Sequence, residues 1–156
     1  MRVPKYLRVW KKNPRFWEPQ LDNIIIDAYI EGGVVPIREV PIEFRATYRD
    51  TLSRFALACH RAGYGPAKSG KKRWVNSTFR FRDEQQKLYD QNMISPGVPK
   101  PGHALTAVPG TSPHERGIGI DVPDVRLETK LIRECRKLGL MDDVPSEKWH
   151  LTNHRA

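Results

Sequence analysis

Apolar residues recur at helical spacing in two stretches of the chain. Within 42–63, five of them are separated by four, four, three and four positions, and so share one face of a helix: Phe44, Tyr48, Leu52, Phe55 and Cys59. We expect Gly63 to end this helix. A second amphipathic helix is predicted over 127–138, on the spacing of Leu127, Leu131, Ile132, Cys135 and Leu138. Asp124 is its predicted cap and Gly139 its predicted stop.

Alternating patterns predict three short strands, at 74–81, 116–122 and 148–152. In the first, Val75, Phe79 and Phe81 share one face, opposite Trp74, Asn76, Thr78 and Arg80. Asp83 with Gln86 resembles a capping box, which predicts a short helix over 84–92. Five prolines and three glycines make 95–113 a long loop, and loops of that length are usually functional or mobile.

The order helix, strand, helix, loop, strand, helix, strand is typical of an α+β domain with a small antiparallel sheet and flanking helices. The chain of 156 residues has the length of one domain, so we expect a single domain over 1–156. Prolines at five of the first 41 positions predict an irregular wrap over 1–42, which leaves the motif-bearing part at 74–156.

Composition excludes several classes of protein. Apolar residues make up 38% and charged residues 29%, a balance typical of folded domains. No apolar run is long enough to span a membrane, and two cysteines are too few for a disulfide framework. The basic N-terminus lacks the apolar core of a secretory signal. The net charge of +9 favours a polyanionic partner: nucleic acid, an anionic membrane or a cell wall.

Candidate chemistry first appears in the run Ser-Pro-His-Glu-Arg-Gly-Ile-Gly-Ile-Asp at 112–121. Strand parity places Asp121 on the same face as Gly117 and Gly119, with His114 just before the strand. Glycines inside a strand often indicate close approach by a ligand or by another backbone. A histidine and an aspartate that converge on such a face suit a metal site. The opposite face suits the core: Ile118, Ile120 and Val122.

A second cluster is Glu147-Lys148-Trp149-His150. His150 lies on the strand face opposite Trp149 and Leu151, which we expect to anchor the strand in the core. Glu147 has the wrong parity to share the face of His150, so it must lie at the corner where the strand starts. If it turns inward there, the set is two imidazoles, one metal-binding carboxylate and one free carboxylate, which matches a catalytic zinc with a nearby general base.

These motifs resemble those of the zinc D-Ala-D-Ala carboxypeptidases and L-Ala-D-Glu endopeptidases, cell-wall peptidases related in fold to the Hedgehog signalling domain. The resemblance covers about residues 77–154. It implies a Hedgehog/DD-peptidase fold and a Zn²⁺ held by His114, Asp121 and His150, with Glu147 as the catalytic base.

The resemblance extends upstream to Phe79-Arg80 and to Gln85, five residues after Arg80. It implies that Arg80 is catalytic and stabilises the substrate carboxylate or the oxyanion. It also implies that Ser112 and Gln85 bind the substrate peptide. Gly119 stands where alanine is usual in the family, a departure that bears on substrate preference more than on metal binding.

The implied function is zinc-dependent hydrolysis of peptide bonds in peptidoglycan stem peptides, at either the L-Ala-D-Glu or the D-Ala-D-Ala bond. An alternative is a non-catalytic, zinc-bearing cell-wall binding module of the same fold, although an intact Glu147 favours catalysis. A nucleic-acid partner is disfavoured, because the aromatic residues fall mostly on core-facing positions.

The missing signal favours a phage-type endolysin, made in the cytoplasm and acting on the wall after release; otherwise the protein would be cytoplasmic. We expect a monomer without stable membrane insertion. The excess positive charge lies largely in 2–15 and 68–82, outside both motifs, and favours adhesion to an anionic wall.

The remaining histidines and the cysteines have simpler interpretations. We expect His60, His103 and His154 to face solvent. Cys59 and Cys135 lie on apolar helix faces and should be buried free thiols.

Overall fold

Two helices in the first half of the chain form much of the framework. In the computed structural model, which describes residues 19–65 and 70–156, α2 spans Pro19–Tyr29 and α3 spans Ile42–Ala62. α3 ends at Gly63, whose φ of 102° is a left-handed conformation that glycine adopts at little cost. The predicted helix and its stop are confirmed. The prediction that 1–42 is irregular is wrong for residues 19–29, which form α2. Pro19 is compatible with this helix because it stands at the first helical position, where proline is tolerated.

The other helices are shorter. α4 spans Arg82–Asn92 and α5 spans Thr129–Lys137, and three 3₁₀ helices are η1 (Ile37–Glu39), η2 (Pro113–Arg116) and η3 (Val125–Leu127). The two predicted side-chain caps are wrong. α4 begins after Phe81 without a side-chain cap, and Asp124, at a φ of 46°, precedes η3 without one. A capping box exists instead at Ser112 and Glu115, around η2.

The strands within 19–65 and 70–156 form three small sheets. β1 (Ile30–Gly32) pairs in parallel with β2 (Arg73–Val75), and β3 (Met93–Ser95) pairs antiparallel with β4 (Val98–Pro99). The third sheet is antiparallel, in the order β5 (Gly119–Asp121), β7 (His150–Asn153) and β6 (Leu140–Met141). The fold is therefore α+β with small sheets and flanking helices, as predicted.

Two predicted strands are shorter than the pattern suggested. The first stops at Val75, and Ser77 beyond it makes only an isolated bridge to Asp121. Thr78 is buried rather than outward-facing, because its hydroxyl donates to the Gly33 carbonyl at 2.9 Å. The second strand starts only at Gly119, because 113–116 winds into η2.

The core lies where α2 and α5 pack against α3. Its largest fully buried apolar side chains come from the helices and from all three strands of the β5–β7–β6 sheet: Tyr29, Tyr48, Phe55, Ile25, Leu52, Leu57, Ile120, Leu131, Leu140 and Leu151. α2 thus supplies part of the core, whereas residues 1–18 of the predicted wrap lie outside the described residues. The predicted single domain remains a prediction.

Several single-residue expectations are settled by burial. Cys59 and Cys135 are buried free thiols, and His103 and His154 are exposed, as predicted. His60 is buried, so the expectation that it faces solvent is wrong; its Nδ1 lies 2.9 Å from the Tyr29 hydroxyl. Leu127, predicted on the apolar face of the second long helix, belongs to η3 and is 69% exposed.

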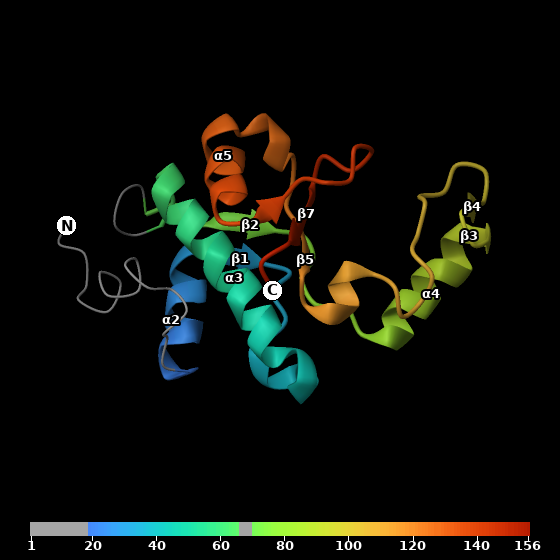
Figure 1. Cartoon of the computed structure of the whole chain (residues 1–156), viewed down its shortest axis with the longest axis horizontal. Coiled ribbons are helices and arrows are strands. Elements are labelled where there is room, and N and C mark those ends of the chain that lie inside the picture. Colours follow the sequence, from blue (N-terminus) through green and yellow to red (C-terminus); the bar gives the residue numbers. More distant parts are fainter. Residues whose placement is uncertain (1–18, 66–69) are drawn as a thin grey trace.

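Figure 1 shows how these elements position the site. α3 crosses in front of the β1–β2 sheet, while α4 and the β3–β4 hairpin extend to the right as an arm that leads away from the rest of the fold. The predicted loop at 95–113 includes β4 and then returns from the arm to η2. Among the described residues, no helix has the length and apolar character needed to cross a membrane.

Candidate metal centre

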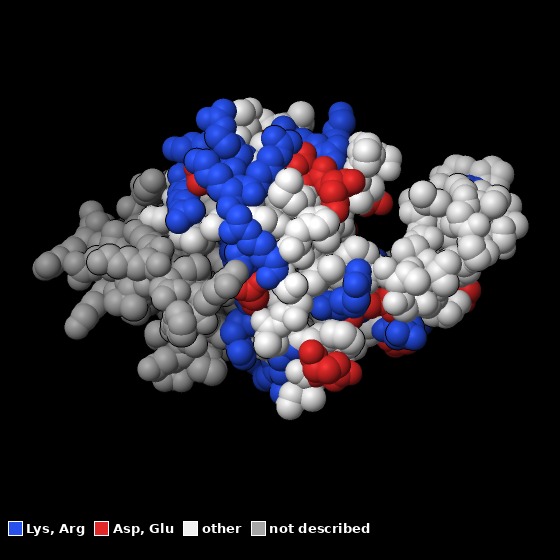
Figure 2. All heavy atoms as spheres, viewed as in Figure 1, with Lys and Arg blue, Asp and Glu red and all other residues white. Residues whose placement is uncertain are grey.

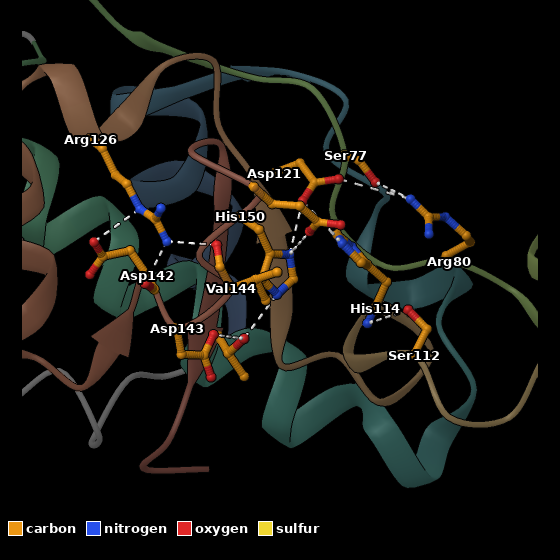
Figure 3. Close-up of polar contacts among 12 residues, drawn as sticks. Ser77, Arg80, Ser112, His114, Asp121, Arg126, Asp142, Asp143, Val144 and His150 are labelled. Atoms are coloured by element: carbon orange, nitrogen blue, oxygen red, sulfur yellow. Dashed lines mark hydrogen bonds and ion pairs between the residues drawn. The ribbon is translucent and has the colours of Figure 1, made fainter. Parts of the chain in front are cut away.

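Three ligand-type side chains from different elements meet at one point: His114 from η2, Asp121 from the end of β5 and His150 from the start of β7. The antiparallel register pairs Asp121 directly with His150. Their donor atoms lie within 4.8 Å of one another, and within 19–65 and 70–156 this is the one such group of three. The sequence-predicted ligand set is therefore brought together, as Figure 3 shows.

Glycines bring η2 onto β5. Gly117 ends η2 at a φ of 76°, and a Cβ there would lie 2.9 Å from Cβ of Tyr48. A Cβ on Gly119 would lie 3.0 Å from the backbone nitrogen of His114. Of the two explanations for these glycines, close approach by another part of the protein is the correct one. Gly119 lets η2 lie against β5, and Gly117 lets α3 approach the same segment.

The ring of His114 is held in one tautomer. Its Nδ1 lies 2.8 Å from the carbonyl oxygen of Thr78, which only accepts hydrogen bonds, so Nδ1 carries the proton. Nε2 is then left with a free lone pair, 3.2 Å from Oδ1 of Asp121. A hydrogen bond to one ring nitrogen that leaves the other free is the usual arrangement for a zinc-binding histidine.

His150 presents the opposite nitrogen. Its Nδ1 lies 3.0 Å from the same Oδ1 of Asp121, and its Nε2 lies 2.9 Å from the hydroxyl of Thr152. The imidazoles of His114 and His150 are both buried and meet edge-on, with ring centroids 5.2 Å apart. Two imidazole nitrogens therefore converge on one carboxylate oxygen.

This donor set fits a zinc ion. Burial alone would raise the pKa of Asp121, but interaction with the adjacent imidazoles of His114 and His150 outweighs it and holds that pKa well below its usual range. Asp121 is thus a carboxylate at neutral pH. Two histidines and one carboxylate are a typical catalytic zinc set, and a cation between them would satisfy three lone pairs that otherwise face one another.

Glu147 lies beside this cluster. Its Oε2 is 3.9 Å from Nδ1 of His150, so the carboxylate does turn inward at the corner before β7. The local chain explains the turn: the amide of Glu147 donates to the Val144 carbonyl, and the amide of His150 donates to the Glu147 carbonyl. Glu147 remains partly exposed, which leaves it accessible to water and substrate.

Arg80 approaches from the other side. Its Nη2 lies 4.0 Å from Oδ2 of Asp121 and 3.3 Å from Oγ of Ser77. Its Nη1 donates to Oε1 of Gln85 at 2.9 Å, and Gln85, which is buried, donates in turn to the Ala107 carbonyl at 2.8 Å. The Gln85 amide is thus used to hold Arg80 and the returning loop in place.

Ser112 has a similar supporting position. Its Oγ accepts from the backbone amide of His114 at 3.3 Å, and its own amide donates to Glu115. These contacts cap η2 and fix the backbone that carries His114. Ser112 and Gln85 nevertheless both line the pocket described next, so their substrate-binding roles remain predictions.

A pocket of about 340 Å³ lies over the cluster, with the five polar candidates Arg80, His114, Asp121, Glu147 and His150 in its lining. Residues of the arm and the returning loop form the rest of the wall, among them Leu88 and Ala104–Ala107. Of the described residues that line it, Arg80 is the only lysine or arginine. A larger hollow of about 530 Å³, lined by parts of α2, β1 and η1, contains none of these candidates.

Trp149 is a pocket residue that the sequence pattern misassigned. It was expected to anchor β7 in the core but is 43% exposed and lines the pocket. β7 begins only at His150, so Trp149 precedes the strand and strand parity does not apply to it. Leu151, inside the strand, is fully buried as predicted. The wall formed by the arm carried no recognisable signal, because it depends on how α4 is placed relative to the sheet.

Comparison with known proteins agrees with this geometry. Residues 44–154 match the VanY family, described as D-alanyl-D-alanine carboxypeptidase. No curated protein and no solved structure matches significantly. The family match covers more than half of the chain, including all seven predicted site residues and α3 from Phe44 onward. The chain therefore belongs to the VanY family of zinc D-alanyl-D-alanine carboxypeptidases, with the Hedgehog/DD-peptidase fold.

Proposed function

We propose that this protein hydrolyses a peptide bond in the stem peptides of peptidoglycan, with His114, Asp121 and His150 as its zinc ligands and Glu147 as its general base. The observation that carries the proposal is the position of Glu147. Its carboxylate lies at the edge of the ligand cluster and inside the same pocket. A purely binding module has no need for a free carboxylate at that point, which disfavours the non-catalytic alternative.

Zinc bound at this site would supply a water of lowered pKa and would polarise the scissile carbonyl. The chain's own residues perform the remaining tasks. Glu147 takes a proton from the attacking water and returns it to the leaving amine, a general acid–base role. The hydrogen bond of His114 to Thr78 keeps the ligand ring in place during these transfers.

Arg80 is placed to interact with negative charge. Hydrogen bonds to Gln85 and Ser77 fix its guanidinium before substrate binds, so little reorganisation is needed as charge develops. It faces either the oxyanion of the tetrahedral intermediate or the terminal carboxylate of a D-Ala-D-Ala substrate. Arg80 is the one guanidinium among the described residues that line this pocket, and its partner on the substrate would differ between the two candidate bonds. Which bond is cleaved is therefore the main question for experiment.

The family match favours the D-Ala-D-Ala bond. To test this, purified peptidoglycan is digested with the zinc-loaded protein and the products are identified by mass spectrometry. Carboxypeptidase action releases free D-Ala and leaves the glycan-linked stem otherwise intact. Cleavage of L-Ala-D-Glu would instead expose new N-terminal D-Glu and separate the stem from the glycan.

The Glu147→Ala variant should bind zinc normally but lose roughly 10²- to 10⁴-fold in rate, the usual contribution of a general base. Glu43→Ala, a change at an exposed carboxylate in the first turn of α3, is the matched control and should keep full activity. If zinc-loaded wild type releases neither product, the enzymatic proposal is refuted. Wild-type rates in Glu147→Ala would remove Glu147 from the mechanism.

A lytic, endolysin-like role is the finer proposal, and it is supported by the net charge of +9, which favours contact with anionic walls. Removal of a terminal D-Ala trims a stem without opening the wall, whereas a cut within the stem detaches cross-links. A lytic role therefore requires the endopeptidase activity. We expect a fall in turbidity of a wall suspension only if the digest also yields N-terminal D-Glu; released D-Ala with constant turbidity would contradict the lytic role.

A further inference from the structure

Behind His150, away from the pocket, two hydrogen bonds lead from the ring to a carboxylate. Nε2 of His150 lies 2.9 Å from Oγ1 of Thr152, and that hydroxyl donates to Oδ1 of Asp143 at 2.9 Å. Thr152 follows His150 by two positions on β7 and is buried, while Asp143 lies between β6 and β7. Neither Thr152 nor Asp143 lines the pocket, so neither contacts a substrate bound there.

The direction of these bonds is set by the number of protons. A threonine hydroxyl has one hydrogen, and the Asp143 carboxylate can only accept. The hydroxyl of Thr152 must therefore donate to Asp143 and accept from His150. Nε2 of His150 then carries the ring proton, and Nδ1, the nitrogen that faces Asp121, keeps its lone pair for a metal.

Asp143 is itself held in place from outside. Nε2 of His154 lies 2.6 Å from its Oδ2. Burial opposes ionisation of Asp143, but the hydrogen bonds from His154 and Thr152 lower its pKa overall, so it is an acceptor at neutral pH. Figure 3 shows Asp143 on the side of His150 opposite His114 and Arg80.

We propose that Asp143 and Thr152 are positioning residues that hold His150 with its proton on Nε2 and its Nδ1 free for zinc. The inference rests on the proposed zinc site and adds two residues to it that the sequence motifs do not include. Threonine is required for its hydroxyl, and Asp143 for its acceptor oxygen. Outer contacts of this kind typically account for a 10- to 100-fold difference in metal affinity.

The test compares four variants with the wild type. Thr152→Val removes the hydroxyl at nearly constant volume, Thr152→Ser retains it, and Asp143→Ala removes the acceptor. Asp90→Ala, at an exposed carboxylate on α4, is the control. Zinc dissociation constants are measured by competition with a chromophoric chelator, and melting temperatures in EDTA show that each variant folds. If Asp143→Ala does not fold, the valine and serine variants at position 152 are sufficient for the comparison.

We expect zinc to bind about 10- to 100-fold more weakly to Thr152→Val and Asp143→Ala, and as in wild type to Thr152→Ser and Asp90→Ala. A second readout is the imidazole N–H proton of His150 in the NMR spectrum of the zinc-loaded protein. It should exchange slowly in wild type and Thr152→Ser, and rapidly in Thr152→Val.

Wild-type zinc affinity together with an unchanged N–H signal in Thr152→Val would overturn the proposal. An equal loss of affinity in the valine and serine variants would also overturn it, because packing rather than the hydroxyl would then be responsible. Neither readout uses a substrate. Failure of the wild type to cleave peptidoglycan would therefore count against the proposed function and not against this inference.

Discussion

Thr78 connects the candidate zinc site to the rest of the fold. Its hydroxyl donates to the Gly33 carbonyl and accepts from the amide of Val35, while its own carbonyl accepts from His114. The hydroxyl of Tyr48 lies 2.9 Å from that of Thr78 and donates to the Val35 carbonyl at 2.7 Å. The orientation of a metal ligand therefore depends on a buried polar network centred on one threonine.

Tyr48 gives this network a measurable pH dependence. Burial raises the pKa of Tyr48 from 10.0 to about 12, although its hydrogen bonds oppose the rise. The folded protein thus holds the phenol proton more tightly than the unfolded chain does. The stability that Tyr48 contributes is fully present below pH 10 and is lost as the pH rises toward 12.

We expect Tyr48→Phe to lower the free energy of unfolding by about 1–3 kcal/mol at neutral pH, because buried acceptors lose their donor. The variant should also show a smaller loss of stability between pH 10 and 12. Urea titrations across that range measure both effects. Tyr89→Phe, at a partly exposed position on α4, is the control. Identical alkaline profiles for wild type and Tyr48→Phe would contradict the prediction.

At the scale of elements, the segment between β6 and β7 is held by η3. The guanidinium of Arg126 donates to three backbone carbonyl oxygens of this segment, at 2.6 Å to Asp142, 2.7 Å to Val144 and 3.1 Å to Pro145. Figure 3 shows Arg126 reaching toward Asp142 and Val144. Because Glu147 hydrogen-bonds back to Val144, the position of the proposed base depends on this clamp.

We expect Arg126→Met to lower kcat roughly 10- to 100-fold at saturating zinc, because a displacement of about 1 Å at a catalytic group has an effect of that size. Methionine keeps an apolar stem but cannot donate to the carbonyls. Arg133→Met, at an exposed position on α5, is the control. Steady-state rates on an isolated stem peptide provide the measurement, and an unchanged kcat in Arg126→Met would show that the segment holds its shape without the clamp.

At the scale of the whole molecule, charge and chemistry occupy different surfaces. On the face shown in Figure 2, Lys and Arg side chains gather over α5 and continue over α3, while uncharged residues cover most of the arm. Much of the positive charge that lies away from the two zinc motifs belongs to 2–15 and 68–69, which are not among the described residues. In the described part, the basic residues on α5 supply a further cationic surface apart from the pocket.

The core is also separate from the ligands. α2, α3 and α5 pack together without side chains from the zinc cluster, and His114 and His150 have protein hydrogen bonds of their own. We therefore expect the protein to stay folded when zinc is removed. Adding zinc at 100 times its dissociation constant should stabilise the fold by about 2.7 kcal/mol, or roughly 5–10 °C in Tm. Calorimetry with EDTA and with zinc checks this, and loss of the cooperative transition in EDTA would contradict it.

The sequence was sufficient to predict features that depend on the spacing of neighbouring residues along the chain. The 3.6-residue spacing and Gly63 predicted α3, and the spacing of His114, Asp121 and His150 predicted the ligand set, because strand parity and loop entry place such residues within reach of one partner. Patterns failed where distant contacts decide the outcome. The alternation at 74–81 predicted a full strand, but pairing is available only as far as Val75, and Thr78 is drawn inward by Gly33.

The sequence by itself thus determined the fold class, the zinc motifs and the family of this protein. Tertiary structure alone decided that Trp149 faces the pocket, that Thr78 fixes the tautomer of His114, and that Asp143 orients the Thr152 hydroxyl behind His150. The physical reason is that ligand identity resides in residue type and local spacing. Proton positions and the shape of the pocket, in contrast, depend on hydrogen bonds and packing between segments far apart in the chain.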